Sequence, residues 1–280
     1  MKDIAVLITS HNRKNLTLNC LSKLYKQSGI DKLFTIDVFL VNDASSDGTV
    51  DAVKKHYKKV KIINGNGNLY WNRGMHLAWK TASKIKKYDF FMWLNDDVSL
   101  YEYSIVHLLD CSKISLYKSI ICGVFETSYN SHEISYGGGN IINGVYHPNE
   151  IETDKLQLCT IINGNCVLIP FYVFKIVGYN DPIFPHSLGD HDYVLRAKKL
   201  HIKTFSSIKF IGKCKRNELL PNWCLPSVNL IDRIKSLYSP LGNSHPYFYS
   251  IYIIRHFGFF KFLKNLISIH IRLFFPILWK

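Results

Sequence analysis

Residues 4–12 read Ile4-Ala5-Val6-Leu7-Ile8-Thr9-Ser10-His11-Asn12, five apolar residues followed at once by four polar ones. A continuous apolar run of this length predicts a strand that is buried on both faces. The residues that come next, Asn15–Gln27, carry apolar side chains at helical spacing. Strand followed by helix is the unit from which parallel sheets are built.

The strand and helix pattern repeats through the first hundred residues. Further strands are predicted at Ile36–Val41, Val60–Ile63 and Phe90–Leu94, and the helices that join them at Thr49–Tyr57 and Gly74–Lys86. Near-continuous apolar strands joined by helices indicate an α/β fold with a mostly parallel sheet covered on both faces.

Polar clusters follow three of these strands. They are Thr9-Ser10-His11-Asn12, Asn42-Asp43 and Asn95-Asp96-Asp97. Open α/β sheets bind ligands outside the carboxyl ends of their strands, so three such clusters predict a binding crevice at this edge. Taken alone, a strand followed by Asn-Asp-Asp is an ordinary turn.

The pattern is weaker after Val98. It predicts a helix at Tyr103–Ser115, strands at Ile120–Val124 and Val167–Ile169, and a helix opened by Gly189-Asp190-His191-Asp192 that runs to about Leu200. A glycine-rich hairpin is expected around Gly137-Gly138-Gly139 and Asn143-Gly144. No repeat or low-complexity linker interrupts this part, which predicts one domain over residues 1–215.

Composition and charge exclude a disordered chain and indicate an anionic partner. The 280 residues are 47% hydrophobic and 14% aromatic, enough to bury a large core. The formal net charge of +14 favours binding to an anionic partner, which could be phosphates, nucleic acid or an anionic membrane leaflet. The excess is concentrated after residue 214, where two acids (Glu218 and Asp232) accompany Lys215, Arg216, Arg233, Lys235, Arg255, Lys261, Lys264, Arg272 and Lys280.

The cysteines and the N-terminus indicate a cytosolic protein. Seven scattered cysteines show neither the close pairing of a zinc site nor the density of a disulfide scaffold, so we expect reduced thiols. Met1-Lys2-Asp3 leads directly into the first strand, which argues against a cleaved secretion signal.

The last segment, Tyr247–Lys280, combines aromatic and aliphatic residues with scattered basic ones. No uninterrupted apolar run approaches the ~20 residues that a spanning helix needs. A polar stripe (Lys261, Lys264, Ser268, Arg272) instead lies opposite an apolar one (Phe260, Leu263, Ile267, Phe274), a pattern typical of a helix lying in a membrane interface. Packing onto the domain predicted over residues 1–215 or into an oligomer is the alternative.

The order of the motifs, rather than any one of them, resembles family 2 glycosyltransferases of the GT-A fold, in particular the bacterial surface-polysaccharide and rhamnosyltransferase-like type. The resemblance spans roughly residues 3 to 200. Five segments carry it: Ile8–Arg13, Val41–Thr49, Asn68–Met75, Asn95–Asp97 and Gly189–Arg196. In this order they are similar to the family's nucleotide-binding turn, D-S-x-D-G-T element, N-x-G helix start, acidic metal-binding triplet and E-D-x-D-x-x-x-R element.

The resemblance implies a GT-A fold with a Rossmann-like sheet and a C-terminal amphipathic helical tail. Its catalytic domain would divide into a nucleotide-sugar half, about 1–100, and an acceptor half, about 101–215, with residues 216–280 as a basic, aromatic extension. The implied enzyme moves a sugar from a UDP- or dTDP-linked donor to a glycan or lipid-linked acceptor, with inversion, in surface polysaccharide biosynthesis. It would act in the cytoplasm, with residues 247–280 against the inner face of the cell membrane.

The resemblance also implies residue roles. Thr9 and Asp43 would contact the base and ribose, Asp97 would bind Mg or Mn with Asp96 in support, and Asp190 would be the acceptor base. The remaining implied donor-binding residues are His11, Asn12, Arg13, Asn72 and Arg73, and the implied acceptor or supporting residues are Asp192 and Arg196.

Structural alternatives stand beside three of these roles. Asp43 could form an Asx-turn or cap before Thr49, and Asp190 could be the N-cap of its helix. Asp192 and Arg196, four residues apart, could form only a surface ion pair.

The sequence departs from the family pattern at three places. Asn95 replaces the first acid of the triplet, and Gly189 stands where the family commonly has Glu. Lys209–Lys213 contains no histidine, where relatives often place a metal ligand. His186 and His191 are candidate substitutes, and the third protein ligand of the metal stays unassigned.

Two other classes of protein fit less of the sequence. An NAD-dependent oxidoreductase needs a G-x-G-x-x-G turn, but Thr9-Ser10-His11-Asn12 contains no glycine and Gly65–Tyr70 lacks the third one. A non-enzymatic nucleic-acid-binding protein would explain the positive charge and the aromatic tail. It would not explain the acidic triplet Asn95–Asp97 or Asp190 and Asp192, which would repel phosphates unless a metal intervened, so no nucleic-acid partner is expected.

Overall fold

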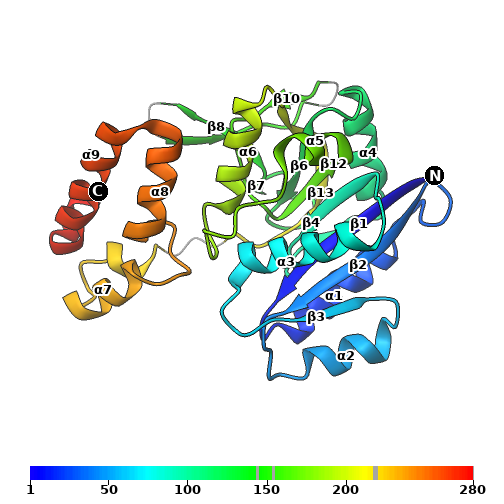
Figure 1. Ribbon diagram of the computed structural model, residues 1–280, viewed down its shortest axis with the longest axis horizontal. Coiled ribbons are helices and arrows are strands. Elements are labelled where there is room, and N and C mark those ends of the chain that lie inside the picture. Colours follow the sequence, from blue (N-terminus) through cyan, green and yellow to red (C-terminus); the bar gives the residue numbers. More distant parts are fainter. Residues whose placement is uncertain (143–144, 153–154, 217–219, 280) are drawn as a thin grey trace.

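The computed structural model describes residues 1–142, 145–152, 155–216 and 220–279, and within them a ten-stranded sheet forms the centre of the molecule (Figure 1). Its first half is parallel. Strand β1 (Lys2–Ser10) pairs with β2 (Phe34–Asn42) on one side and β4 (Phe90–Leu94) on the other, and β3 (Lys61–Asn64) pairs with β2. The predicted parallel α/β arrangement is confirmed.

Helices cover both faces of the sheet, because β1 is apolar on both. Ile4, Val6 and Ile8 join the core on one face, while Ala5 and Leu7 join the core on the other. The first core takes residues of α1 (Lys14–Tyr25), α2 (Thr49–His56) and α4 (Ser104–Ile114). The second takes residues of α3 (Tyr70–Ile85), α5 (Phe171–Val177) and α6 (Gly189–Lys199).

The second half of the sheet is mixed. Strand β12 (Cys166–Pro170) runs antiparallel to both β4 and β6 (Ile120–Glu126), and β13 (Thr204–Lys213), which the sequence pattern does not predict, runs parallel to β6. The short strands of this sheet are β5 (Ser99–Leu100), β7 (Ile134–Tyr136) and β10 (Gln157–Leu158). A second sheet holds β8 (Gly138–Ile142), β9 (Val145–Pro148) and β11 (Ile161–Ile162). Strands β8 and β9 form the predicted hairpin, whose expected turn at 143–144 lies outside the described residues.

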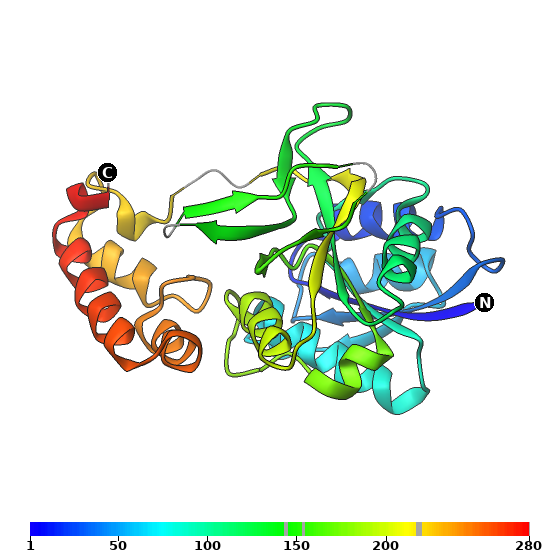
Figure 2. The same cartoon turned by 90° about the horizontal axis from the view of Figure 1, so that it is seen from above.

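The segment after residue 220 is a group of helices at one end of the molecule (Figure 2). They are η1 (Asn222–Cys224), α7 (Leu230–Leu237), α8 (Pro246–Phe257), α9 (Phe259–Phe274) and η2 (Pro276–Trp279). Gly258, with φ of 90°, separates α8 from α9, and α9 carries the amphipathic stripe predicted between Phe260 and Phe274.

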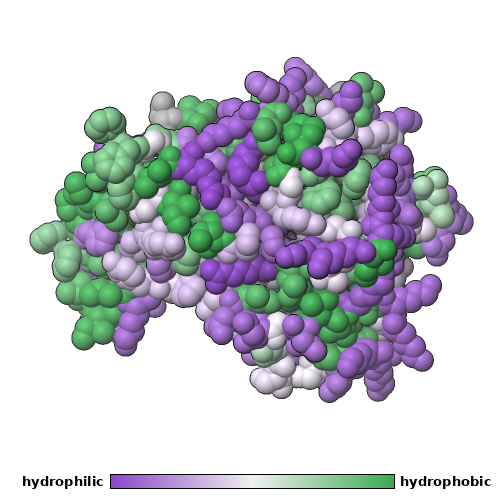
Figure 3. Space-filling view, in the orientation of Figure 1, coloured by the Kyte–Doolittle hydropathy of each residue, from purple (hydrophilic) through white to green (hydrophobic). Residues whose placement is uncertain are grey.

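The two tail helices pack differently. Helix α8 buries Tyr252 and Ile253 against Phe184 and Leu188 of the catalytic region. Helix α9 buries Ile269 and Leu273 in a small core of the tail itself and leaves much of its apolar surface exposed, as Figure 3 shows at this end of the molecule. No helix in the described part of the chain combines the length and the hydropathy of a membrane span.

Candidate active site

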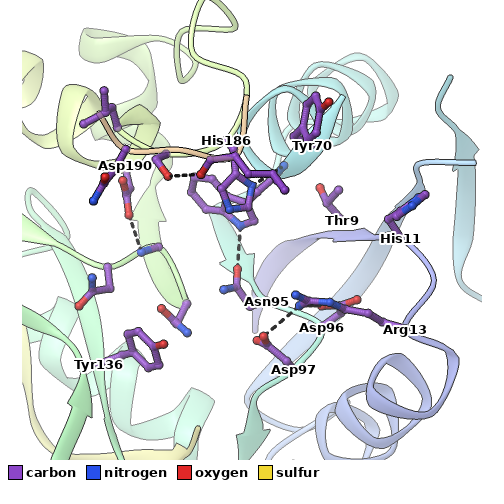
Figure 4. Close-up of a pocket in the computed structure, with 18 of the residues that line it drawn as sticks. Thr9, His11, Arg13, Tyr70, Asn95, Asp96, Asp97, Tyr136, His186 and Asp190 are labelled. Carbon is purple, nitrogen blue, oxygen red and sulfur yellow. Dashed lines mark hydrogen bonds and ion pairs between the residues drawn. The ribbon is translucent and has the colours of Figure 1, made fainter. Parts of the chain in front are cut away.

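A cleft of about 1520 Å³ lies at the carboxyl ends of β1, β2 and β4 and is walled on the far side by the start of α6 (Figure 4). Its volume exceeds that of a typical small-ligand pocket, which leaves room for two substrates. Seven of the predicted site residues line it: Thr9, His11, Arg13, Asp43, Asp96, Asp97 and Asp190.

The acidic pair after β4 is held by Arg13. The Nη1 atom of Arg13 lies 3.2 Å from Asp96 Oδ1 and 3.0 Å from Asp97 Oδ2. Asp96 is buried and its Oδ2 also accepts a hydrogen bond from the Thr17 hydroxyl at 3.2 Å. Burial is the largest influence on the pKa of Asp96 and raises it, against the opposing effect of Arg13. Asp97 Oδ1 is buried without a hydrogen-bond partner in the described part of the molecule.

Asn95, the departure from the acidic triplet, has a structural partner. Its Oδ1 accepts a hydrogen bond from the Trp71 indole at 2.7 Å. The Trp71 ring in turn packs edge-on against Trp93, with ring centroids 5.7 Å apart. An amide at this position therefore fixes the start of α3 over the cleft.

Asn12 joins the loops that follow β1 and β2 and does not line the cleft. Its backbone is left-handed, with φ of 51°. Its Oδ1 accepts from the Ser46 amide at 2.8 Å, and its own amide donates to Ser45 Oγ at 2.9 Å. These bonds hold the loop after β1 against the loop after β2.

Asp43 lines the cleft, but its carboxylate is engaged by the backbone that leads into α3. Its oxygens accept from the amides of Gly67 at 2.7 Å, Leu69 at 2.9 Å and Tyr70 at 3.0 Å. The Thr49 amide at the start of α2 donates to Asp47 Oδ1 instead, at 3.1 Å. These bonds explain why α3 begins at Tyr70, four residues before the predicted Gly74.

Asp190 lies in the first turn of α6, on the side of the cleft opposite Asp97 (Figure 4). Its side chain is 15% exposed, and its Oδ2 accepts from the Gly164 amide at 2.9 Å. The N-cap position of the helix belongs to Leu188, so Asp190 is not the N-cap. A side chain at the preceding Gly189 would overlap Asn72, which explains why glycine replaces the family's glutamate there.

Asn72 and Arg73 do not line the cleft, and both bond to the loop that precedes α6. Asn72 is fully buried and donates to the carbonyl oxygens of Asp181 and Phe184, each at 2.7 Å. Arg73 Nε donates to the Pro182 carbonyl at 2.9 Å. Both side chains thus hold the segment that carries His186.

Asp192 and Arg196 also lie away from the cleft. The Asp192 side chain has no solvent exposure, and Arg196 Nε bonds its Oδ2 at 2.8 Å. Two tail residues bond its Oδ1: Arg255 Nη1 at 2.7 Å and His256 Nε2 at 2.9 Å. The pair is therefore no surface ion pair but the centre of a buried cluster that joins α6 to α8.

The metal-binding prediction concerns the acidic pair and the histidines near it. The described residues contain no group of three or more His, Cys, Asp or Glu placed to hold an ion. His186 and His191 both line the cleft, and burial lowers the pKa of His186, which favours the neutral imidazole that metals bind. Because Asp97 Oδ1 is a buried acceptor without a partner, the acidic pair fits a hard cation there.

Several cleft residues were not predicted from the sequence. They include Asn163, Gly164 and Asn165 from the loop before β12, Tyr136 of β7, and Leu241 and Asn243 from the tail. Asn163-Gly164-Asn165 directly precedes an apolar strand, and this turn signal was available in the sequence. The tail residues gave no signal, because long-range contacts bring that segment to the cleft: the packing of α8 and the hydrogen bond from Ser187 Oγ to the Leu241 carbonyl at 3.2 Å.

Solved structures share this fold at low sequence identity. S. aureus TarS superposes with a TM-score of 0.57 and 14% identity over 92% of this chain, which spans 44% of the TarS chain. TarS 1–349 in complex with UDP-GlcNAc gives a TM-score of 0.56 with 15% identity, over 92% of this chain and 73% of that one. The mannosyltransferase PcManGT from Pyrobaculum calidifontis, in complex with GDP-Man and Mn2+, gives a TM-score of 0.57 with 14% identity, over 98% of this chain and 71% of that one.

No curated protein matches this sequence. The family model for glycosyl transferase family 2 matches residues 5–174, more than half of the 280-residue chain. That match covers the β1 loop, the Asp43 loop and the acidic pair, which lie at the carboxyl ends of β1, β2 and β4. The chain therefore belongs to glycosyl transferase family 2 and is a glycosyltransferase.

Proposed function

We propose that this enzyme transfers a sugar from a UDP- or dTDP-linked donor to a glycan or lipid-linked acceptor, with inversion at the anomeric carbon. The observation that carries the proposal is the single cleft that places Asp97 and Asp190 on opposite sides. One acid faces the expected diphosphate and the other faces the expected acceptor. The UDP-GlcNAc and GDP-Man complexes of the structural relatives support a nucleotide-sugar donor.

The proposed step is one displacement. The acceptor hydroxyl oxygen bonds to the anomeric carbon, the bond from that carbon to the diphosphate oxygen breaks, and the hydroxyl proton passes to Asp190. Attack on the face opposite the leaving group inverts the configuration. Asp97 would hold the divalent cation, Mg or Mn, which when bound supplies positive charge to the departing diphosphate.

A screen of nucleotide-sugars by thermal shift tests the donor class, because a ligand that binds only the native state raises its apparent stability. The nucleotide-sugar that stabilises the protein would then be supplied with candidate glycan and lipid-linked acceptors. Stabilisation by no nucleotide-sugar, with or without Mn²⁺, would overturn the proposal.

Binding of UDP or dTDP is expected to depend on a divalent cation and on Asp97. The diphosphate enters a cleft that already holds the Asp96 and Asp97 carboxylates, so its charge must be offset. Removing Mn²⁺, or changing Asp97→Ala with Mn²⁺ present, should weaken binding by about tenfold or more, which is ~1.4 kcal/mol or more. Titration calorimetry measures both effects.

The control is Asp51→Ala, which removes an exposed carboxylate from α2 outside the cleft and should leave binding unchanged. Equal affinity of Asp97→Ala and wild type in the presence of metal would remove Asp97 from the site.

The tail supports the proposed acceptor and location. On α9, Phe260 is 87% exposed and Ile267 is 59% exposed, and Lys261 and Lys264 are also exposed. An apolar face bordered by basic side chains suits the interface of an anionic membrane. We therefore place residues 216–280 as an extension whose last helix contacts the inner face of the cell membrane, where a lipid-linked acceptor for surface polysaccharide would be presented.

Truncation after Gly258 is expected to lower association with anionic vesicles and to leave transfer to a soluble acceptor mimic largely intact. It removes Lys261, Lys264 and Arg272, each worth ~1 kcal/mol near a charged leaflet. It keeps α8, which ends at Phe257 and carries the contacts to α6. Vesicle co-sedimentation and a transfer assay measure the two effects.

The truncation exposes Trp223 and Leu237, which pack against α9, and could therefore alter the fold of the tail. A full-length variant tests vesicle binding without this change. Phe260→Ser combined with Lys261→Gln and Lys264→Gln changes only exposed side chains and should lose vesicle binding as well. Unchanged vesicle binding, or an insoluble truncation, would favour a tail that exists to pack against protein.

A further inference from the structure

Arg13 occupies the place at which the acidic pair would meet a cation. A single nitrogen, Nη1, bridges Asp96 Oδ1 and Asp97 Oδ2, and Figure 4 shows the contact with Asp97. The two carboxylates and the guanidinium together carry one negative charge. A divalent ion on Asp97 would therefore be repelled by the nearby guanidinium, and Arg13 also occupies Oδ2, which leaves the ion only Oδ1 of that carboxylate.

The three side chains differ in their freedom to move. Asp96 is buried, with 4% of its side chain exposed, and is also bonded to Thr17. The Arg13 side chain is 49% exposed, and among the described residues its guanidinium bonds only through Nη1. Its backbone is fixed at the start of α1, where its carbonyl accepts from the Thr17 amide at 2.9 Å. The guanidinium can therefore swing on its stem while the acidic pair stays in place.

The cleft offers Arg13 a second partner once a donor is bound. Arg13 lines the cleft between the nucleotide-binding loop, with Thr9 and His11, and the acidic pair. A diphosphate that reaches the acidic pair from that loop passes beside Arg13. Guanidinium groups bind phosphate oxygens in a planar, often bidentate geometry, which a lone Nη1 contact to a carboxylate does not provide.

We infer that Arg13 holds Asp97 when the cleft is empty and releases it to the divalent cation when a nucleoside diphosphate draws the guanidinium to its phosphates. This inference rests on the proposed function, which places the cation at Asp97. Arg13 then weakens cation binding to the free enzyme and strengthens nucleotide binding in the presence of the cation. It makes the two ligands cooperative, and the coupling must be reciprocal.

The test measures Mn²⁺ binding directly, without turnover. Free Mn²⁺ is followed by electron paramagnetic resonance for the wild type and Arg13→Gln, first alone and then with saturating UDP. Alone, Arg13→Gln should bind Mn²⁺ about tenfold more tightly than the wild type, because the competing charge is gone. With Mn²⁺ present, the same variant should bind UDP about tenfold more weakly, so that the cooperativity between the two ligands is lost.

Two further variants complete the design. Arg13→Lys keeps the charge and should retain the weak Mn²⁺ binding of the free wild type, while Arg13→Met repeats the neutral substitution and separates charge from any effect particular to glutamine. Because Arg13 is half exposed, we expect the melting temperatures to stay close to that of the wild type.

The outcomes distinguish the inference from the function on which it rests. Equal Mn²⁺ affinity of wild type, Arg13→Gln and Arg13→Met without nucleotide would overturn the inference, even if Mn²⁺ and UDP bind the wild type together. No binding of Mn²⁺ to the wild type, with or without UDP or dTDP, would overturn the proposed cation site itself.

Discussion

Changing Asp190→Asn is expected to lower the turnover number at saturating donor by about 10²- to 10⁴-fold and to leave donor binding nearly unchanged. A base acts in the transition state, so its loss affects the rate and not the ground-state complex. Asparagine keeps the size of the side chain and retains an oxygen for the Gly164 amide. The melting temperature should therefore move little. Transfer rate, donor affinity and melting temperature are measured on the same preparation.

The matched control is Glu133→Gln, which neutralises another carboxylate that lines the cleft. It should turn over at nearly the wild-type rate. A near-normal rate for Asp190→Asn would remove Asp190 from the chemistry, and its only role would then be to bond the loop before β12. Asp192 is a poor substitute, because its side chain has no solvent exposure and its oxygens are bonded to Arg196, Arg255 and His256.

The parallel half of the sheet could be predicted from the sequence because its signals are local. Strand β1 is apolar at every position from Ile4 to Ile8, so one pattern determines both the strand and the burial of its two faces. The polar residues after β1, β2 and β4 reach one edge because parallel strands all end there. Six of the seven predicted site residues that line the cleft meet there for this reason, and the seventh, Asp190, comes from α6.

The roles of Asn72 and Arg73 depend on contacts that no local pattern records. Their partners, the carbonyl oxygens of Asp181, Pro182 and Phe184, lie more than a hundred residues later in the chain. A motif match places these two residues beside the donor, but the fold uses them to hold the segment before α6. The same long-range packing explains Gly189, since the space of a side chain there is filled by Asn72.

Strands β6 and β12 in the second half of the sheet were predicted, but β10, β11 and β13 were missed because they are short or irregular. Strand β13 pairs with β6 through two register shifts, and β10 and β11 have two residues each. Two residues are too few to show the alternation of apolar and polar side chains that is typical of a strand. The amphipathic stripe between Phe260 and Phe274 predicted α9, whereas only the contact of α8 with α6 shows that the first part of the tail packs against the catalytic region.

Changing Asp192→Asn is expected to destabilise the protein by about 3 kcal/mol, toward the lower end of the cost of breaking a buried ion pair. The carboxylate is inaccessible to solvent and bonds Arg196, Arg255 and His256, so its loss leaves these groups without their charged acceptor. Arg196 and Arg255 keep 24% and 30% of their side-chain exposure, which lets water compensate in part. Urea unfolding measures the free energy of unfolding.

The effect should depend on pH in a defined direction. Burial alone would raise the pKa of Asp192, but the hydrogen bonds from His256, Arg196 and Arg255 outweigh it, and the pKa is lowered. A lowered pKa in the folded state stabilises the protein above the unfolded value of about 3.9, and this stabilisation is lost as the pH falls through the folded value. The difference in the free energy of unfolding between wild type and Asp192→Asn should therefore be largest at neutral pH and should shrink below about pH 4.

The control is Asp232→Asn, which removes the acid of an exposed pair with Lys235 on α7 and should leave the unfolding curve unchanged. A pH-independent loss for Asp192→Asn would mean that packing, not charge, makes Asp192 important. No loss at all would mean that α8 docks through Tyr252 and Ile253 alone. We expect a loss of stability that depends on pH, because the tail binds the charged Asp192 carboxylate through Arg255 and His256. Asp190 lies two residues earlier on the same helix, α6, so this contact also anchors the helix that carries the proposed base.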